Sequence, residues 1–327
     1  MKERENQSEI LIPKPISPLS KDSTIIPEFD VVAEYLKELK HNSSAVATRL
    51  ALTKLLQLTT ESTVLGLRQE LEHTIQKLNE SVKDISVRPV CDLFKIELGN
   101  QMKQGEDFQT TIKHMIERGI KNKNLTKQAI NKITLESERF FSEGMRIVTY
   151  SYSRVVLECL YTARRRCNIS VAVLCGGPDE DGKRMTTELQ KRKIITTFVP
   201  DSAMSAVIAD ADMVLVGARA VTENGGIIAK MGTRTVATVA HEFNVNFFVA
   251  AESYKFAKLF PLSQHHLERI APIRGIPIDK KNLPPGTPVY SPELDYTPPN
   301  YIRNLWTDLG LLTPSDVSEE LFVLYNA

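Results

Sequence analysis

The sequence predicts an α/β protein, in which an all-helical N-terminal domain precedes a Rossmann-like domain with a parallel sheet. Two observations support this prediction. Residues 30–144 contain a single internal proline, and their apolar residues recur at intervals of three and four. The residues that follow carry short apolar runs at 194–199, 213–216 and 247–250, none of which alternates with polar residues. Such runs are typical of strands buried on both faces of a parallel sheet.

The all-helical domain is expected over residues 29–144. One apolar stripe continues for about six helical turns, because its members step by three or four residues throughout. These members are Val64, Leu67, Leu71, Ile75, Leu78, Val82 and Ile85. Further helices fit residues 90–103, 108–121 and 126–143. Helices of this kind can pack on one another as an up-and-down array.

The Rossmann-like domain is expected over residues 145–327, with Gly144 at the boundary. Strands fit residues 146–149 and 170–174, and with the three apolar runs they make five parallel strands. The strands are separated by helix-like segments at residues 153–166, 185–193, 203–209 and 227–243. This alternation predicts right-handed crossovers and a doubly wound sheet.

The two ends of the chain have a different character. Residues 1–28 are polar and contain four prolines, so we expect a disordered tail. Residues 261–300 hold nine of the 17 prolines and are expected to form an extended excursion over the surface. Helix is expected again at residues 300–309 and 316–325, with Ser315 as the N-cap of the last helix.

An anion site is one interpretation of the segments that follow the predicted strands. In doubly wound sheets, ligands bind at the carboxyl ends of the strands. Asp201 follows one strand, and Asn224-Gly225-Gly226 follows another just before a predicted helix. Backbone amides at the start of a helix can bind an anion. These glycines could equally serve only to make a tight turn, so the residues alone leave both interpretations open.

Composition and missing motifs exclude several function classes. The net charge of +1 does not indicate a polyanion partner, and the aromatic residues do not interleave with basic ones as in a nucleic-acid platform. The sequence has no phosphate-binding P-loop, no dinucleotide-binding glycine motif and no G-x-S-x-G nucleophile elbow. We therefore expect no direct contact with nucleic acid.

The cysteines and the hydropathy indicate a cytosolic or nuclear protein. The four cysteines form no CxxC pair, and no histidine lies at a metal-ligand spacing from them. They are expected to be reduced core thiols, without a metal or another cofactor. No apolar run approaches membrane-spanning length, and the N-terminus does not resemble a signal peptide, so no membrane contact is expected.

Eight segments carry a more specific signal. They are residues 148–154 (VTYSYSR), 201–203 (DSA), 216–218 (VGA), 223–233 (ENGGIIAKMGT), 251–253 (AES), 258–262 (KLFPL), 295–297 (DYT) and 307–315 (TDLGLLTPS). In this order they resemble the alpha subunits of eukaryotic translation initiation factor 2B, the guanine nucleotide exchange factor for initiation factor 2. The resemblance extends from Asp30 to the C-terminus and is strongest after Thr149.

The resemblance implies a regulatory subunit without catalytic residues. Such a subunit pairs with itself through the Rossmann-like half and bridges two copies of the beta, delta, gamma and epsilon subunits. Together the regulatory subunits respond to the phosphorylated alpha subunit of initiation factor 2. The helical domain would face that phosphorylated subunit, with exposed basic residues such as Arg49, Lys54 and Arg68 as candidate contacts. For each of these residues, simple solvation is the alternative.

The same superfamily includes methylthioribose-1-phosphate and ribose-1,5-bisphosphate isomerases, which transfer protons with a Cys and with the Asp of an Asn-Gly-Asp motif. By this resemblance, the Cys position falls at Ser151 and the Asp position at Gly226. An unassisted serine hydroxyl is a poor acid and base near neutral pH, and Gly226 has no proton to transfer. Residues 174–178 (LCGGP) also replace the Thr-Glu-Ser-x-Pro segment of the relatives.

The resemblance therefore implies a degenerate sugar-phosphate pocket. Its expected residues are Ser151, Arg154, Asp201, Asn224, Gly225, Gly226 and Lys230. Two adjacent backbone amides after the second strand could still cradle an anion. The alternative to a regulatory, non-catalytic subunit is an active sugar-phosphate isomerase, which Ser151 and Gly226 argue against. A third interpretation, a sensing module in which a sugar phosphate stabilises the dimer, is compatible with the regulatory role.

Overall fold

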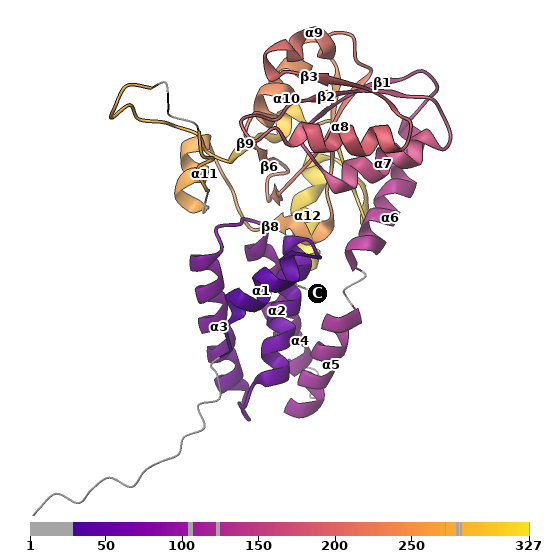
Figure 1. Cartoon of the computed structure of the whole chain (residues 1–327). Helices are drawn as coiled ribbons and strands as arrows, with labels where there is room; N and C mark the ends of the chain where they lie inside the picture. The colour runs from indigo at the N-terminus through magenta and orange to yellow at the C-terminus, as the bar shows by residue number, and fades with distance from the viewer. Residues whose placement is uncertain are drawn as a thin grey trace, which may run out of the picture.

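The computed structural model describes residues 29–103, 107–121, 125–271, 273–278, 281 and 283–326. The predicted disordered tail, residues 1–28, lies outside the described residues. Figure 1 shows a body of helices from the N-terminal part of the chain, with the main sheet and its flanking helices stacked on one end of it. Within the described ranges, no helix combines the length and the hydropathy needed to cross a bilayer.

Five helices form the N-terminal body. They are α1 Val31–Leu39, α2 Ser44–Leu58, α3 Val64–Ser81, α4 Val87–Lys103 and α5 Phe108–Lys121. Local capping fixes where the first three begin, since the side chains of Asp30, Ser43 and Thr63 each accept a hydrogen bond from an amide in the first turn. Helix α2 packs against α1, α4 and α5 and is the central helix of the body.

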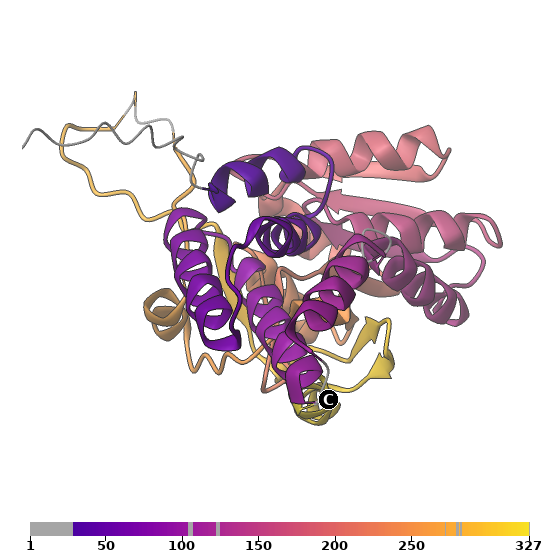
Figure 2. The same ribbon diagram turned by 90° about the horizontal axis from the view of Figure 1, so that it is seen from below.

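Helix α6, Leu125–Ser137, packs with the sheet rather than with the N-terminal body. Its Ile130 and Ile133 belong to the apolar core that covers one face of the sheet, together with Trp306. Figure 2 shows α6 beside the sheet helices, at the end of the row of N-terminal helices. The helix thus lies on the N-terminal side of the predicted boundary at Gly144, although its apolar residues belong to the sheet core.

The main sheet has seven strands in the order β11-β10-β7-β4-β1-β2-β3. Their bounds are β1 Arg146–Tyr150, β2 Ser170–Leu174, β3 Ile195–Val199, β4 Met213–Gly217, β7 Asn246–Ala250, β10 Asn304–Thr307 and β11 Gly310–Leu312. All neighbours pair in parallel except β10 and β11. The five predicted parallel strands and the α/β fold class are confirmed. Four crossover helices accompany them: α7 Arg154–Arg164, α8 Asp181–Lys191, α9 Met204–Ile208 and α10 Thr233–Glu242.

The prediction of one helix over residues 227–243 is wrong. Residues Ile227–Lys230 form strand β6, and α10 begins only after Gly232. The φ of this glycine is +103°, so the chain turns between the strand and the helix. Strand β6 belongs to a second sheet with the order β8-β5-β6-β9, in which β5 is Ala220–Thr222, β8 is Phe256–Ala257 and β9 is Leu294–Thr297. Short buried apolar runs fit a strand and a helix equally well, and here pairing with β5 and β9 decides.

Two predictions near the C-terminus also need correction. Residues 300–309 form no α-helix: a 3-10 turn ends at Tyr301, and strand β10 follows, with the side chains of Leu305 and Trp306 fully buried in the sheet. The excursion over residues 261–300 contains a short helix, α11 Gln264–Ile270, as well as β9. The last helix, α12 Val317–Asn326, follows a turn that is capped by Thr313 and Asp316 rather than by Ser315.

Candidate functional site

A cavity of about 360 Å³ lies where the strand order of the main sheet reverses. From β1 the chain continues to β2 and β3 on one side and then crosses to β4 on the other side. Loops that follow β1, β4 and β7 line the cavity, as the first turn of α2 also does. Ligands of doubly wound sheets bind at this reversal of strand order. Of the seven predicted pocket residues, the cavity brings together Ser151, Arg154 and Lys230.

Ser151 follows β1 directly and holds an uncommon backbone conformation. Its φ is +60°, in the left-handed region that favours glycine, and the residue is 4% exposed. Its amide lies 3.4 Å from the carbonyl oxygen of Leu174. Backbone strain of this kind persists only where the surrounding structure enforces it, and it concentrates at ligand sites.

Cationic side chains, helix N-termini and the carboxylates of Asp181, Glu252 and Glu293 line the cavity. Arg154 opens α7, and Arg184 on α8 stacks its guanidinium 3.9 Å from the ring centroid of Tyr152. Lys230 forms an ion pair with Asp179 at the rim. The serines of the lining are Ser43, Ser44, Ser86, Ser151 and Ser153. Helix N-termini attract negative charge and hydroxyls bond other hydroxyls, so the lining suits a small phosphorylated polyol.

A buried carboxylate organises the wall that follows β7. Glu252 is 2% exposed and pairs with Lys255 at 2.6 Å, while the Tyr254 hydroxyl donates to it at 3.0 Å. Burial alone would raise the pKa of Glu252, but Lys255 and the hydrogen bonds outweigh burial, so the pKa is lowered. Glu252 is therefore a carboxylate at neutral pH, with its charge largely balanced by Lys255.

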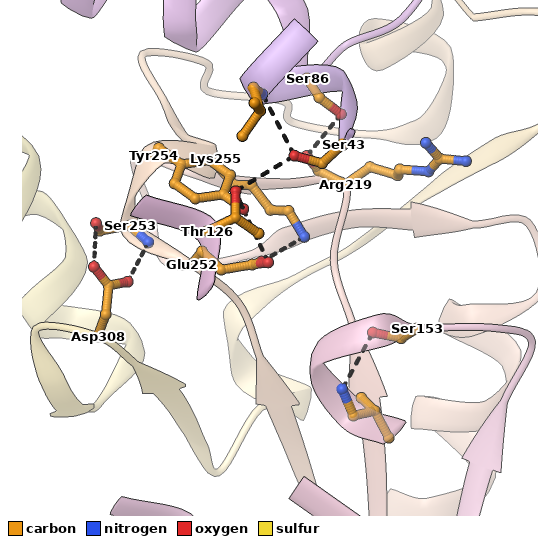
Figure 3. A network of polar contacts seen from close by, with 12 residues as sticks. Ser43, Ser86, Thr126, Ser153, Arg219, Glu252, Ser253, Tyr254, Lys255 and Asp308 are labelled. Carbon is orange, nitrogen blue, oxygen red and sulfur yellow. Dashed lines mark hydrogen bonds and ion pairs between the residues drawn. The ribbon is translucent and has the colours of Figure 1, made fainter. Parts of the chain in front are cut away.

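The N-terminal helices close over this wall, as Figure 3 shows. The Tyr254 hydroxyl lies 3.2 Å from the Thr126 hydroxyl, which lies 3.5 Å from that of Ser43 at the start of α2. Ser86 donates to the carbonyl oxygen of Arg219 at 3.4 Å. Polar contacts between the helical body and the sheet therefore surround the cavity, so both parts of the chain contribute to one site.

Residues Asn224-Gly225-Gly226 form the tight turn between β5 and β6, which is the second of the two interpretations that the sequence left open, and a strand rather than a helix follows them. The amide of Gly225 donates to the Thr222 carbonyl oxygen at 2.8 Å, and the amide of Thr222 donates to the Gly226 carbonyl oxygen at 2.8 Å. The Asn224 side chain accepts from the Thr222 hydroxyl at 2.6 Å and donates to the Tyr296 hydroxyl at 2.7 Å. None of the three turn residues lines the cavity.

Asp201 lies outside the cavity lining as well. One of its carboxylate oxygens accepts from the amide of Gly176 at 3.0 Å, and the other accepts from that of Gly177 at 2.9 Å. These are the two adjacent amides that were expected to cradle an external anion. They cradle the carboxylate of Asp201 instead.

Comparison with known proteins identifies the family. Residues 39–314 match the initiation factor 2 subunit family. The chain belongs to that family. It is 35% identical over 313 residues to translation initiation factor eIF2B subunit alpha of Dictyostelium discoideum, which covers 91% of this chain and 98% of that protein. The resemblance drawn from the eight sequence segments is confirmed.

The family also includes enzymes of similar sequence. A ribose 1,5-bisphosphate isomerase of Thermococcus kodakarensis is 32% identical over 192 residues, which span 58% of this chain and 60% of the enzyme. A solved chain of the tetrameric eIF2B-beta2-delta2 complex from C. thermophilum superimposes with a TM-score of 0.74 at 17% identity, over 90% of this chain and 93% of that chain. This structural likeness shows the shared fold.

The three basic residues that were candidate contacts for a partner protein differ in how exposed their side chains are. The prediction that Arg49 is exposed is wrong, because its guanidinium forms a two-fold ion pair with Glu97 and lies over the ring of Phe94. Only 12% of the Arg49 side chain is exposed. Lys54 is half-buried on α2, and Arg68 on α3 is exposed. The central position of α2 explains the burial, since periodicity alone did not show which helix lies in the middle.

Arg68 lines a second hollow, which we call the basic groove. It lies between α3, α4 and α12, and its charged residues are Arg68, Glu72, Arg88, Asp92, Lys95 and Lys258. Apolar side chains and Tyr325 complete the lining, and the Lys258 ammonium lies 4.4 Å from the ring centroid of Tyr325. Arg68 and Arg88 form no ion pair with any described residue. The groove therefore offers unpaired cations above an apolar floor.

One buried carboxyl was not assigned a role from the sequence. Asp295 on β9 is 4% exposed and accepts hydrogen bonds from the amides of Gly232 at 2.8 Å and Arg234 at 3.1 Å. It thereby caps α10, whose first residue, Thr233, lines the cavity. Burial raises the pKa of Asp295 to about 7, although the two amide hydrogen bonds act in the opposite direction. The sequence signal that could have identified this buried carboxyl is the acidic residue itself, which stands between Leu294 and Tyr296 in an apolar strand.

Replacement of this carboxyl should change how stability depends on pH. In the unfolded chain Asp295 loses its proton near pH 4, whereas in the native state it holds the proton until about pH 7. The native state therefore binds more protons over this range, and stability falls as pH rises. Asp295→Asn keeps an oxygen acceptor for both amides and removes the titration. Between pH 4 and 7 the wild type should lose roughly 2–4 kcal/mol of unfolding free energy relative to the variant.

Urea unfolding followed by circular dichroism at several pH values measures this difference. Asp210→Asn, at an exposed position, is the control and should follow the wild type. If the unfolding free energies of the wild type and Asp295→Asn changed with pH in parallel, the raised pKa of Asp295 would be contradicted.

Proposed function

We propose that this chain is a regulatory, non-catalytic subunit of the guanine nucleotide exchange factor for translation initiation factor 2. The observation that carries this proposal is the 35% identity to an eIF2B alpha subunit across 98% of that subunit. In this role the chain works in the cytoplasm, pairs with itself and bridges two copies of the beta and delta subunits, which hold the gamma and epsilon subunits. It takes part in the response to the phosphorylated alpha subunit of initiation factor 2.

Self-pairing through the Rossmann-like half is supported by the surface of that half. Strand β3 forms an edge of the main sheet, with Ile195 69% exposed and Phe198 39% exposed. Exposed apolar residues on an edge strand are a liability unless a partner or another segment covers them. A relative with the same fold assembles as a tetramer that holds two copies each of its beta and delta subunits.

The full chain should sediment as a dimer at micromolar concentration. Analytical ultracentrifugation measures this against the monomer mass of 36.7 kDa. The whole chain is the suitable sample, because a fragment that starts at residue 145 would lack α6 and expose the sheet face that Ile130 and Ile133 cover. A monomer at that concentration would remove the bridging role.

The cavity supports a second proposed role, the binding of a sugar phosphate as a signal rather than as a substrate. Arg154 and the N-termini of α2 and α7 would bind the phosphate, and the serine hydroxyls would bind the sugar. Ser151 and Lys230 from the predicted set lie in the lining. Asn224, Gly225 and Gly226 are expected to act on the pocket only through the β5–β6 turn.

No isomerase turnover is expected on ribose 1,5-bisphosphate. A missing general acid or base typically costs about a hundredfold to ten-thousandfold in rate, and both groups of the related enzymes are replaced here. Gly226 leaves no space for the missing carboxylate, since a Cβ atom there would lie 2.7 Å from the Tyr296 ring and 2.8 Å from the Thr297 carbonyl oxygen. Product formation is assayed beside the Thermococcus kodakarensis isomerase as a positive control. A rate well above the uncatalysed one would overturn the non-catalytic assignment.

We place the docking of the phosphorylated alpha subunit of initiation factor 2 at the basic groove. A phosphoserine adds roughly −1.5 to −2 charge and is bound well by arginine. The groove holds four cations and two carboxylates, and Arg68 and Arg88 are free to accept a new anionic partner. Arg49 is a poor candidate, because reversal of its charge would leave Glu97 facing a second carboxylate at the centre of the helical body.

The double substitution Arg68→Glu and Arg88→Glu should reduce inhibition by the phosphorylated factor and leave complex assembly and basal nucleotide release unchanged. Loss of charged hydrogen bonds predicts binding of the phosphorylated partner weakened by about tenfold or more. Nucleotide release by the reconstituted complex, with and without phosphorylated factor, gives the measurement.

The matched control is Lys83→Glu with Lys113→Glu, which reverses the same number of charges at exposed positions of the helical body outside the groove. Full inhibition in the Arg68 and Arg88 variant, or equal loss in the control, would reject the groove as the docking site.

A further inference from the structure

The carboxylate of Asp201 fills a nest made by two successive backbone amides. Each of its oxygens accepts one hydrogen bond, from Gly176 at 3.0 Å and from Gly177 at 2.9 Å. Gly176 holds a φ of +72°, which turns the two amides toward the same point. Hydrogen bonds from amides to a carboxylate are stronger than those between neutral groups. The pair therefore fastens the loop after β2 to the loop after β3.

The fastened loop carries much of the cavity wall. Gly176 packs directly on Ser151, because a Cβ atom at this glycine would lie 2.9 Å from the Ser151 Cβ atom. Asp179 in the same loop forms the ion pair with Lys230. The loop then enters α8, which presents Arg184 to the cavity. Three cavity groups thus depend on where this loop lies: Ser151 directly after β1, Lys230 on β6 and Arg184 on α8.

We propose that Asp201 is a positioning residue for the cavity: it substitutes for an anion in the Gly176–Gly177 nest and so holds Ser151, Lys230 and Arg184 in place for a phosphorylated ligand. The inference rests on the proposed sugar-phosphate role of the cavity. It gives Asp201 a different task from direct ligand contact, because the residue is absent from the lining and both of its oxygens already bind amides.

Chemical rescue separates this role from a general structural one. Asp201→Ala empties the nest, and affinity for ribose 5-phosphate, measured by calorimetry on the full chain, should fall by about tenfold or more. Formate at tens of millimolar should restore most of that loss, because its carboxylate can occupy the vacated nest. The wild type, titrated with and without formate, shows whether formate itself competes with ribose 5-phosphate for the cavity. Asp210→Ala controls for the loss of one negative charge at an exposed site.

Hydrogen exchange of the segment 175–181 provides a readout that does not depend on the sugar phosphate. Exchange should accelerate in Asp201→Ala and slow again with formate. Unchanged affinity, or weakened affinity that formate does not restore, would overturn the positioning role. If the wild type fails to bind ribose 5-phosphate while formate still protects the variant loop, the sugar-phosphate role is rejected and the nest alone stands. If exchange does not respond to Asp201→Ala, the nest itself is rejected.

Discussion

The reversal of strand order between β1 and β4 is the constraint on which the rest of the structure depends. Chain segments leave these adjacent parallel strands in opposite directions, so no crossover helix fills the space above their carboxyl ends. The N-terminal body reaches that space through Ser43, whose hydroxyl lies beside that of Thr126 on α6, and Thr126 in turn contacts Tyr254 in the wall after β7. The fold therefore creates a cavity that residues of both bodies line.

Prediction from the sequence succeeded where a single physical signal dominated. The apolar runs at 213–216 and 247–250 form buried strands, and the stripe from Val64 to Leu78 forms helix α3. The run at 194–199 also forms a strand, but β3 lies at the edge of the sheet and is largely exposed rather than buried on both faces. Prediction failed where two signals competed. The run Ile227–Lys230 has the composition of either element, and pairing with β5 and β9 decided between them. At residues 300–309 the burial of Trp306 overrode the helical pattern.

The candidate site was predictable only in part, for a similar reason. Ser151 and Arg154 lie at the end of a predicted strand and the start of a predicted helix, whereas Lys230 was expected from the family resemblance alone and lies on β6, where a helix had been predicted. Asp201 also lies at a strand end, but its partner amides come from a different loop, and no local pattern reports such a contact. The exposure of Arg49 depended on which helix is central, which emerges only from the packing of the whole body.

The two candidate surfaces meet in one short segment. Glu252, Tyr254 and Lys255 line the cavity, while Phe256 accepts a hydrogen bond from Tyr325 and Lys258 covers the ring of that tyrosine in the basic groove. A substitution within residues 252–258 therefore alters both surfaces and cannot assign a role to either. The residues that distinguish them are remote from this segment: Arg68 and Arg88 belong to the groove alone, and Asp201 acts on the cavity from the opposite wall. Neither Arg68 nor Arg88 lines the cavity, so substitutions at these two residues test the groove separately from the cavity.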